Sequence, residues 1–385
     1  LTPWNANGSG GSGSEIAPSD VDQLAAFAQA TGWKVLYGIG CFKNGNTSGS
    51  TPNTAANAAS EAAYVANALK GSLWAFEIGN EPNHYNGNTE TISQYESIFN
   101  SFTSAIKAQV PGAVFAGPGP GHDHPMAIQF ASDEGSKIIA LTDHYYVANA
   151  QGTPKPTIAN LINPDTSSNG YGVLPQLHSA QTSHGIPQWR MTEANSFYNG
   201  GVAGLSDGFV SALWGLDYLY EIALNGGAGV CFHGGTTQQF GLSGTLNYSP
   251  IGFGSGGSTA NTPQDVRPLY YGELLFTMAG QGTLHSASVS GSGNITAYGI
   301  GNNVIIVNKT SSTLAATVTV PSAPQGAQQI VLTAPSATST SGETIGGSSV
   351  AVNGAVAPVS ATCSVTGSSV LAVVPGNSAA LILTS

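Results

Sequence analysis

The chain has 385 residues, of which 41% are hydrophobic, so it is long enough for one large domain or two with a substantial core. Nine basic residues against twenty acidic ones give a formal net charge of −11, which argues against nucleic acid, anionic membranes and long sulfated polymers as partners. No run of about 18 apolar residues is present, so no segment is expected to cross a membrane.

Five N-glycosylation sequons occur along the chain. They begin at Asn7, Asn46, Asn247, Asn294 and Asn308. The triplet arises by chance in a sequence rich in Asn, Ser and Thr. Five of them, in a chain with so few Lys, favour a secreted eukaryotic glycoprotein. We therefore expect the protein to be extracellular and N-glycosylated.

The three cysteines, Cys41, Cys231 and Cys363, follow no zinc-binding spacing. An odd number leaves at least one thiol free, or paired with a partner outside this chain. Three buried free thiols are the equally open alternative. No metal and no cofactor is expected.

Residues 1–19 are rich in Gly and Ser and resemble a flexible linker, whereas 20–281 alternate between helical and strand-like segments. A first helix is expected to begin at Ser19, which is a helix N-cap residue, and to continue through 21–32. The expected strands are 33–40, the apolar start of 73–85, 113–120, 137–147, 187–196 and 228–235. The other expected helices are 53–70, 90–110, 126–135, 207–227 and 268–280, with one or two more before His184.

Strands that are apolar throughout, each followed by a helix, predict a parallel sheet covered by helices, here with six βα units. An open nucleotide-binding sheet would show a Gly-rich phosphate loop at a strand–helix junction, and none is present. Polar residues gather instead at the carboxyl ends of the strands, which is where a (β/α)8 barrel carries its active site. The sequence therefore predicts an α/β fold, a (β/α)8 TIM barrel of which six of the eight units are visible.

After Gly280 the pattern changes to short strands separated by Gly, Ser and Pro, and no helical pattern remains. Such a pattern is typical of an antiparallel β-sandwich of about 100 residues. The predicted organisation is a linker-like segment over 1–19, a catalytic barrel over 20–281 and a C-terminal sandwich over 282–385.

Two glutamates stand at the ends of expected strands. Glu81 follows the apolar run LWAFEIG, and Glu193 ends the segment PQWRMTE. A carboxylate at the end of a buried strand is costly unless it is paired or used. Glycoside hydrolysis needs two carboxyl groups facing one sugar, one to protonate the leaving oxygen and one to attack the anomeric carbon. The alternative is that one of the two is only a structural ion-pair partner.

The phrase EIGNEP at 77–82, with a later strand ending in MTEANS, resembles the clan A retaining glycosidases. The motifs DHYY at 143–146 and EANSFYNGG at 193–201, with the C-terminal sandwich, more narrowly resemble glycoside hydrolase family 79, the β-glucuronidases and heparanase-like enzymes. The resemblance implies that 33–40 is barrel strand three and 228–235 is strand eight. Strands one and two are then expected in an N-terminal fragment of the same precursor, which would complete the barrel.

The resemblance also implies a role for each matching residue. Glu81 would be the acid/base and Glu193 the nucleophile. Asn80 would bind the sugar 2-hydroxyl group, and Tyr145 would keep the nucleophile oriented. The substrate carboxylate would be held through phenol and backbone N–H groups, because no Lys or Arg stands near that loop in the sequence. The residues implied for this carboxylate site are Tyr198, Asn199, Gly200 and Tyr248.

Other polar residues have structural interpretations beside functional ones. Glu77 shares the inward parity of Glu81 and is expected to pair with a basic residue of the missing strands. His122 and His124 are either outer-subsite residues or plain loop residues. His233 is either part of the site wall or a core histidine, and Arg190 is expected to face the helices.

The predicted function is a retaining exo-β-glucuronidase that removes terminal β-D-glucuronic acid by double displacement. One alternative is an endo-acting heparanase- or hyaluronidase-like glycosidase, which would need a basic groove that nine basic residues cannot easily line. Another is an inactive carbohydrate-binding fragment, and other clan A sugars stay open if the carboxylate-binding match is mistaken. A glucuronide carbohydrate is thus the expected substrate, and neither nucleic acid nor a membrane is an expected partner.

Overall fold

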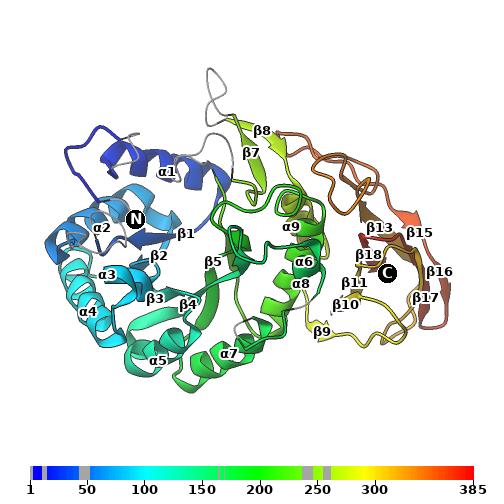
Figure 1. Ribbon diagram of the computed structural model, residues 1–385, viewed down its shortest axis with the longest axis horizontal. Helices are drawn as coiled ribbons and strands as arrows, with labels where there is room; N and C mark the ends of the chain where they lie inside the picture. The colour runs from blue at the N-terminus through cyan, green and yellow to red at the C-terminus, as the bar shows by residue number, and fades with distance from the viewer. Residues whose placement is uncertain are drawn as a thin grey trace. The chain divides into compact units, whose positions relative to one another are not determined.

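The computed structural model describes residues 3–10, 15–42, 53–163, 165–168, 170–235, 246–254 and 262–385. Its first sheet has six strands in the order β1-β2-β3-β4-β5-β6, and the pairs from β1 to β4 run parallel (Figure 1). The strands are β1 Val35–Ile39, β2 Leu73–Ile78, β3 Phe115–Gly121, β4 Ile138–Asn149, β5 Gln188–Tyr198 and β6 Val230–Phe232. Each overlaps a strand expected from the sequence, so the predicted sheet is confirmed.

Helices alternate with these strands, as the sequence predicts. The longer ones are α1 Pro18–Thr31, α2 Ala55–Leu69, α4 Ile92–Gln109, α5 His124–Glu134, α7 Leu174–Ser183, α8 Val210–Leu224 and α9 Pro268–Met278. Three short helical segments matter for the site or the loops, namely η2 Pro82–His84, α3 Tyr85–Asn88 and α6 Ile158–Ile162.

Helix α4 shows how the sequence specifies one of these elements. Thr91 and Gln94 form a capping box that satisfies the first free N–H groups. The apolar stripe then places Phe99 against the sheet, with its ring centroid 6.3 Å from that of Phe115 on β3 and 5.0 Å from that of Phe130 on α5.

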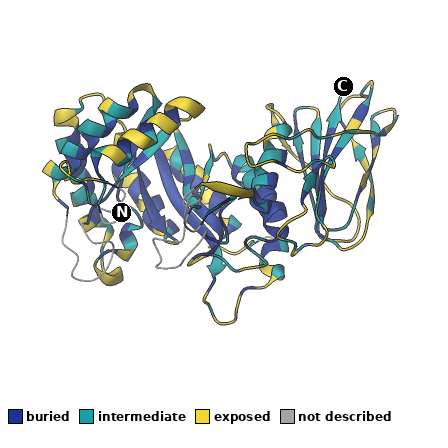
Figure 2. Cartoon of the chain, turned by 90° about the horizontal axis from the view of Figure 1, so that it is seen from above, coloured by how far each residue is buried: buried dark blue, intermediate teal, exposed yellow. Residues whose placement is uncertain are grey.

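The centre of the sheet is more deeply buried than its edges. All seven residues of β3 are buried, whereas Cys231 of the edge strand β6 is exposed and its two neighbours in the strand are half-buried. Figure 2 shows the inner strands as dark ribbons under helices whose outer faces are exposed. Among the described residues the sheet therefore ends at β1 on one side and at β6 on the other.

The N-terminal segment differs from the expected flexible linker in its described part. Trp4 is 5% exposed and forms an isolated parallel bridge with Ile16. The Trp4 ring also lies 5.4 Å from the ring of Tyr64 on α2. A buried aromatic side chain thus anchors a stretch whose composition alone suggested disorder.

The chain divides into two compact units. The first comprises 1–145, 167–193 and 226–231, and the second comprises 146–166, 194–225 and 232–385. This division cuts β4 after Tyr145 and β5 after Glu193, and it does not fall near residue 281. The domain boundaries expected from the sequence therefore stay a prediction.

The second unit carries the antiparallel strands expected after Gly280. Its larger sheet has β9 Leu284–Ser286, β10 Ile295–Ile300, β11 Asn303–Asn308, β13 Ala327–Thr333, β14 Thr344–Ile345, β15 Ala361–Thr362 and β18 Ser378–Thr384. A smaller sheet has β12 Leu314–Thr319, β16 Ser364–Thr366 and β17 Ser369–Val374. A hairpin of β7 Ile251–Phe253 and β8 Pro263–Val266 stands where the sequence predicted only a long loop.

Helices α8 and α9 share one core with the larger antiparallel sheet, which explains where the second unit begins. The residues of this core include Leu213, Leu216, Tyr220, Tyr271, Leu275, Tyr298, Ile305, Leu332 and Leu381. Helix α8 is apolar on nearly every side and is buried over most of its length. A helix with this pattern needs a cover on both sides, and here the C-terminal strands provide one.

The structure separates the sequons by accessibility. Asn308 is fully buried, and its side-chain amide donates to the carbonyls of Ser312, Val374 and Pro375. Asn7 is exposed, and Asn46 lies outside the described residues. Secretion and glycosylation stay predictions, with Asn7 the more accessible acceptor of these two described sites.

The three cysteines are free thiols, and Cys231 is exposed, so the alternative of three buried thiols is wrong for that residue. No helix among the described residues is both long and apolar enough to cross a membrane.

Candidate active site

Glu81 stands just beyond the carboxyl end of β2 in an unusual backbone conformation. Its φ of 49° and ψ of 58° are left-handed, which is uncommon for a residue with a side chain. The Glu81 N–H group donates to the carbonyl oxygen of Gly119 at 2.9 Å, and this contact with the end of β3 fixes the turn. Strained backbone of this kind is concentrated at functional sites.

His144 of β4 connects Glu81 with Glu193 of β5. Its ring Nδ1 lies 3.3 Å from Glu81 Oε1 and 4.0 Å from Glu193 Oε2. The His144 side chain is 2% exposed, whereas those of Glu81 and Glu193 are 25% and 24% exposed. We call these three residues the carboxylate cluster, in which both acids remain open to solvent around a buried imidazole.

The carboxylate cluster is compact. One donor atom from each of Glu81, His144 and Glu193 can be chosen so that all three lie within 4.8 Å of one another. Residues 112 positions apart in the sequence (193 − 81) thus bring their carboxylate oxygens close together. The structure brings together the two glutamates that the sequence singled out.

The charges around His144 decide its protonation state. Burial alone would lower the pKa of His144, but the hydrogen bond with Glu81 and the charges of Glu193, Glu77 and Glu81 outweigh it and raise the pKa to about 9. Burial raises the pKa of the Glu77 carboxyl group, while the charge of His144 and the hydrogen bond that Thr192 donates at 2.9 Å lower it. Glu77 therefore has partners in this chain, where the sequence suggested a basic residue of another segment.

Two glycines of β3 leave the space that the cluster needs. A Cβ atom at Gly119 would lie 3.1 Å from His144 Nε2 and 3.2 Å from Glu77 Oε1. One at Gly121 would lie 2.7 Å from Glu81 Oε1, closer than real Cβ contacts allow. Gly119 and Gly121 thus leave the end of β3 bare toward the acids.

The raised pKa of His144 predicts a pH-dependent stability. The ordinary value is 6.5, so protonated His144 stabilises the fold fully below pH 6.5, and this contribution is lost as the pH rises through 9. It amounts to about 3 kcal/mol at most. Burial also raises the pKa values of Glu61, Glu96 and Glu273 to about 7, and these destabilise the fold as the pH rises from 4.5 to 7.

From pH 7 to pH 9 the contribution of His144 declines, and the three thiols add to the decline near pH 9 because burial raises their pKa values as well. A His144 variant therefore separates the share that belongs to the imidazole. We expect the unfolding temperature to fall across this pH range and His144→Gln to flatten the decline, while His184→Gln on the exposed end of α7 keeps it. An unchanged slope in His144→Gln would contradict a charged imidazole in the cluster.

The cluster has the donor types and spacing of a metal site, so this possibility needs a physical test. A metal ligand must be a neutral imidazole, and the raised pKa of His144 favours the protonated ring. Its Nδ1 is also engaged with Glu81. The arrangement therefore fits a protonated imidazole between two carboxylates better than a metal ion. The absence of a metal from the active protein stays a prediction.

Asn80 and Tyr145 lie next to members of the cluster in the chain and make contacts of their own. The backbone N–H group of Asn80 donates to the Tyr85 hydroxyl oxygen at 2.9 Å. The Tyr145 ring is 1% exposed, 5.8 Å from the ring of His122 and 6.2 Å from that of Tyr171. Their roles toward sugar and nucleophile stay predictions.

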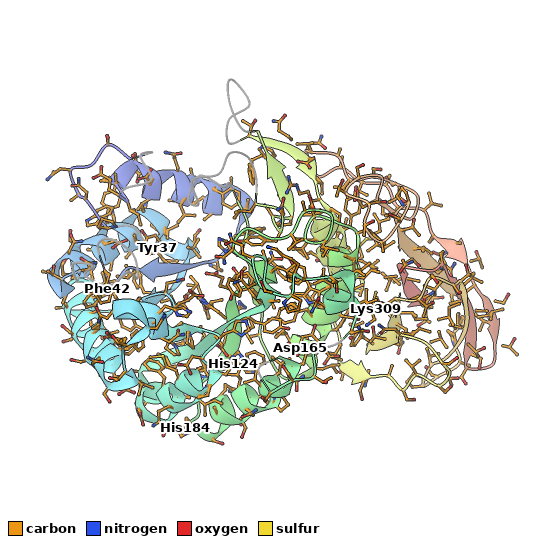
Figure 3. The ribbon with its side chains drawn as sticks, viewed as in Figure 1. Tyr37, Phe42, His124, Asp165, His184 and Lys309 are labelled. Carbon is orange, nitrogen blue, oxygen red and sulfur yellow. The ribbon has the colours of Figure 1, made fainter. Side chains whose placement is uncertain are left out.

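Side chains alternate along β4, so the residues of the DHYY motif lie on two opposite faces of the strand. Asp143 accepts from His124 at 2.5 Å, and both side chains are buried (Figure 3 labels His124). His124 is therefore neither a plain loop residue nor an exposed subsite residue. Because side chains alternate in a strand, Tyr145 shares the face of Asp143, and Tyr146 shares the face of His144. Sequence reasoning missed His144, although this alternation could have indicated it.

A second group, the tyrosine cluster of Tyr146, Tyr198, His233 and Tyr248, lies in the second unit. The hydroxyl oxygens of Tyr146 and Tyr248 lie 2.7 Å and 3.2 Å from His233 Nδ1. The Tyr198 ring is 38% exposed and 6.0 Å from the Tyr146 ring. His233 is thus a hydrogen-bonded member of a polar group, and Tyr146 is a residue that the sequence did not single out.

The loop after β5 supports this cluster. Asn199 and Gly200 have φ values of 64° and 90°, and the Asn199 side chain donates to Asn149 at 3.0 Å. The Gly200 carbonyl accepts from Asn247 at 2.9 Å, next to Tyr248. The structure therefore brings all four residues of the predicted carboxylate site into one unit, in neighbouring segments.

Two supporting residues were not expected. Asn195 is fully buried and donates to the carbonyls of His233 and Tyr248, so it holds two members of the tyrosine cluster. Arg267 donates to the carbonyl of Leu246 at 2.9 Å. A basic side chain thus reaches the segment that carries Tyr248, but its guanidinium group bonds to a backbone carbonyl there.

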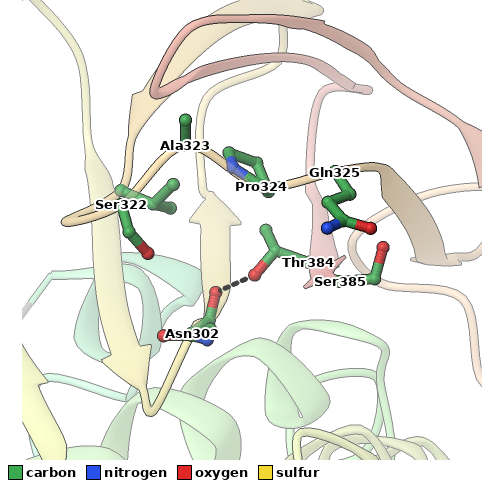
Figure 4. A pocket seen from close by; sticks show the side chains of 8 residues that line it. Asn302, Ser322, Ala323, Pro324, Gln325, Thr384 and Ser385 are labelled. Carbon is green, nitrogen blue, oxygen red and sulfur yellow. Dashed lines mark hydrogen bonds between the residues drawn. The ribbon is translucent and has the colours of Figure 1, made fainter.

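One hollow in the C-terminal strands is not a candidate site. It has a volume of about 250 Å³ and is lined mainly by small polar residues such as Asn302, Ser322, Gln325 and Thr384 (Figure 4). The Thr384 hydroxyl donates to the Asn302 carbonyl within it. No acidic or basic side chain lines it, so it offers no group for acid–base chemistry.

No protein-family model matches the chain. A β-glucuronidase of Aspergillus niger is 24% identical over 234 residues, which are 54% of this chain and 41% of that protein. The matched region thus spans well under half the length of this relative.

Solved structures resemble the whole chain. A 4-O-α-L-rhamnosyl-β-D-glucuronidase of Fusarium oxysporum 12S has a TM-score of 0.77 at 19% identity, covering 99% of this chain and 85% of its own. A GH51 arabinofuranosidase of Xanthomonas axonopodis pv. citri has a TM-score of 0.64 at 14% identity, covering 94% and 78%. These likenesses confirm the predicted fold, a TIM-barrel glycosidase architecture with antiparallel C-terminal sheets, and the predicted resemblance to β-glucuronidases.

Proposed function

We propose that the protein is a retaining exo-β-glucuronidase. The observation that carries this proposal is the carboxylate cluster, in which two solvent-open glutamates, one just beyond β2 and one within β5, each have an oxygen within 4.8 Å of the other. Retaining enzymes hold their carboxyl groups about 5–5.5 Å apart, whereas inverting enzymes need about 6.5–9.5 Å to admit a water molecule. The similarity to a β-glucuronidase supports the choice of sugar.

The reaction proceeds in two displacements. Glu193 attacks the anomeric carbon while Glu81 gives its proton to the departing oxygen, so one C–O bond forms as the glycosidic bond breaks. Glu81 then takes a proton from water, and the hydroxide formed releases the sugar from Glu193. His144 holds the Glu81 side chain, and its positive charge offsets that of the Glu193 carboxylate while Glu81 carries the proton that it donates.

The remaining predicted residues bind the sugar. Asn80 binds the 2-hydroxyl group and Tyr145 orients the nucleophile. Tyr198, Tyr248 and the backbone of Asn199–Gly200 hold the glucuronate carboxylate. Their support is the sequence motif, together with the hydrogen-bonded tyrosine cluster in which the phenol groups stand.

The experiment that tests the function compares substrates. We expect release of p-nitrophenol from the β-glucuronide and no chain cleavage of heparan or hyaluronan. Cleavage inside these polymers would identify an endo-acting enzyme, and no hydrolysis at all would favour an inactive binding fragment. A glucuronide capped with rhamnose at O4 is a necessary third substrate, because the Fusarium protein is named for that activity. A chelator is expected to change none of these rates.

Tyr198→Phe tests the carboxylate site. Removing the phenol group should weaken transition-state binding of glucuronides by roughly 1.5–3 kcal/mol, the cost of a hydrogen bond to a charged group. The matching glucosides should lose far less, because they have no carboxylate. The measurement is kcat/KM for both p-nitrophenyl sugars, with Tyr64→Phe at a half-buried position of α2 as the control. Equal losses for both sugars would assign Tyr198 to the scaffold.

We also propose that another polypeptide segment, most simply an N-terminal fragment of the same precursor, completes the barrel. The support is the pair of sheet edges at β1 and β6, where unpaired N–H and C=O groups of a sheet covered by helices are costly. We expect residues 1–385 alone to unfold without a sharp transition and to be inactive, and the fragment to restore both properties. A cooperative transition with full activity in the chain alone would refute this.

A further inference from the structure

We propose that His84 recognises the leaving group of the substrate, by accepting a hydrogen bond from a hydroxyl group next to the glycosidic oxygen. The inference rests on the proposed function, in which Glu81 protonates that oxygen. A residue that stands beside the proton-donating atom of Glu81 then faces the leaving group and not the glucuronate ring.

Glu81 and His84 meet over one glycine. A Cβ atom at Gly121 would lie 2.7 Å from Glu81 Oε1 and 2.8 Å from His84 Nε2, so both atoms border the space left by the missing side chain. The backbone also joins them, because the His84 N–H group donates to the Glu81 carbonyl at 2.9 Å across η2.

Asn83 fixes this arrangement from the other side. Its side-chain amide donates to the Gly121 carbonyl, and its side-chain oxygen accepts from the Gly121 N–H group, both at 2.8 Å. The paired hydrogen bonds hold the end of β3 against the segment that carries Glu81 and His84. The space over Gly121 is therefore a built feature of the site and does not depend on one rotamer.

The hydrogen bonding of the imidazole sets what it can recognise. His84 Nδ1 lies 2.7 Å from the side-chain oxygen of Asn88, which only accepts, so Nδ1 carries a proton. In the neutral ring, Nε2 is then an acceptor aimed at the space beside Glu81. His84 is exposed and Glu81 is 25% exposed, so a ligand can reach both. The chemical class that fits is a hydroxylated, non-aromatic leaving group such as another sugar.

A matched pair of substrates tests the inference. One is cyclohexyl β-glucuronide, and the other carries an added hydroxyl group on the ring carbon next to the glycosidic oxygen. We expect the wild-type protein to prefer the hydroxylated compound by about fivefold to tenfold in kcat/KM. His84→Ala should lose this preference, Asn88→Ala should reduce it, and His184→Ala should keep it. The ratio of two rates in one sample does not depend on how much protein is folded.

The outcomes separate this inference from the proposed function. If wild type hydrolyses p-nitrophenyl β-glucuronide but shows no preference, or if His84→Ala keeps the preference, the role of His84 is wrong and the function stands. If wild type hydrolyses no glucuronide even together with the fragment that completes the barrel, both are wrong. Loss of the preference in His84→Ala, with hydrolysis of the p-nitrophenyl compound retained, supports both.

Discussion

Replacement of Glu193 by alanine is expected to abolish turnover of every substrate, by about 10⁴-fold or more in kcat, because no other group on the site can form the covalent intermediate. Replacement of Glu81 should act differently. Loss of a general acid costs about 10²–10⁴-fold for a poor leaving group, and almost nothing for a leaving group that departs without a proton. Glu81→Ala should therefore retain the first displacement of a dinitrophenyl glucuronide.

Azide identifies which carboxylate is which. In Glu81→Ala, azide should react with the glycosyl-enzyme and give a glucuronyl azide of β configuration, because that intermediate has already been inverted once. In Glu193→Ala, azide can only replace the missing nucleophile and give the α product. The measurements are steady-state rates and the product configuration by NMR, with Asp133→Ala on the exposed side of α5 as a control. The opposite pattern would exchange the two roles, and equal losses on all leaving groups in Glu81→Ala would remove its role as acid.

The sheet could be predicted from the sequence because its signals are local. Each strand is an apolar run of limited length, and the helix between two strands has its own stripe and cap, as Thr91 and Gln94 show for α4. Glu81 could be predicted for the same reason, because it follows an apolar strand. Glu193 could be predicted from its motif, but the structure continues its strand to Tyr198, so it lies within β5 and not at its end.

What the sequence could not indicate depends on contacts between distant residues. The position of His144 between two acids requires the register of β4 against β2 and β5, and a one-residue shift would exchange its face with that of Tyr145. In the sequence, the glycines and prolines around Gly119 and Gly121 suggest a loop and not a strand. The bare end of β3 gains a meaning only when the atoms of Glu77, Glu81 and His84 are placed beside it.

The second unit shows the same limit for a whole segment. Helix α8 was predicted from the sequence. Its apolar residues lie on all sides, which indicates that other elements cover it on both of its faces. The sequence did not show that the C-terminal strands are the cover, because residues such as Leu216 and Ile305 lie far apart in the chain. A boundary drawn where the pattern changes therefore separates elements that share one core.

A buried ion pair in that core predicts the largest effect on stability. Lys309, directly after β11, bonds to Asp217 of α8, and their side chains are 1% and 9% exposed (Figure 3 labels Lys309). Asp217 also accepts from the hydroxyl groups of Thr296 at 2.5 Å and Tyr298 at 3.1 Å. These contacts join α8 to β10 and β11 through polar groups inside an otherwise apolar core.

Removing one partner should cost far more than removing both. Lys309→Met leaves the Asp217 carboxylate buried without a counter-charge, and we expect a loss of about 3–5 kcal/mol in the free energy of unfolding. The double variant Asp217→Leu, Lys309→Met fills the same space with apolar groups and should recover most of that loss.

Urea unfolding followed by tryptophan fluorescence measures this difference for the single and double variants in the same protein preparation that shows activity. Lys34→Met is the matched control, because Lys34 is exposed and should change the free energy by less than about 1 kcal/mol. Additive losses in the double variant would show that the two charges stabilise the core separately. In that case the apolar contacts of α8, and not the pair, would carry the attachment of the C-terminal strands.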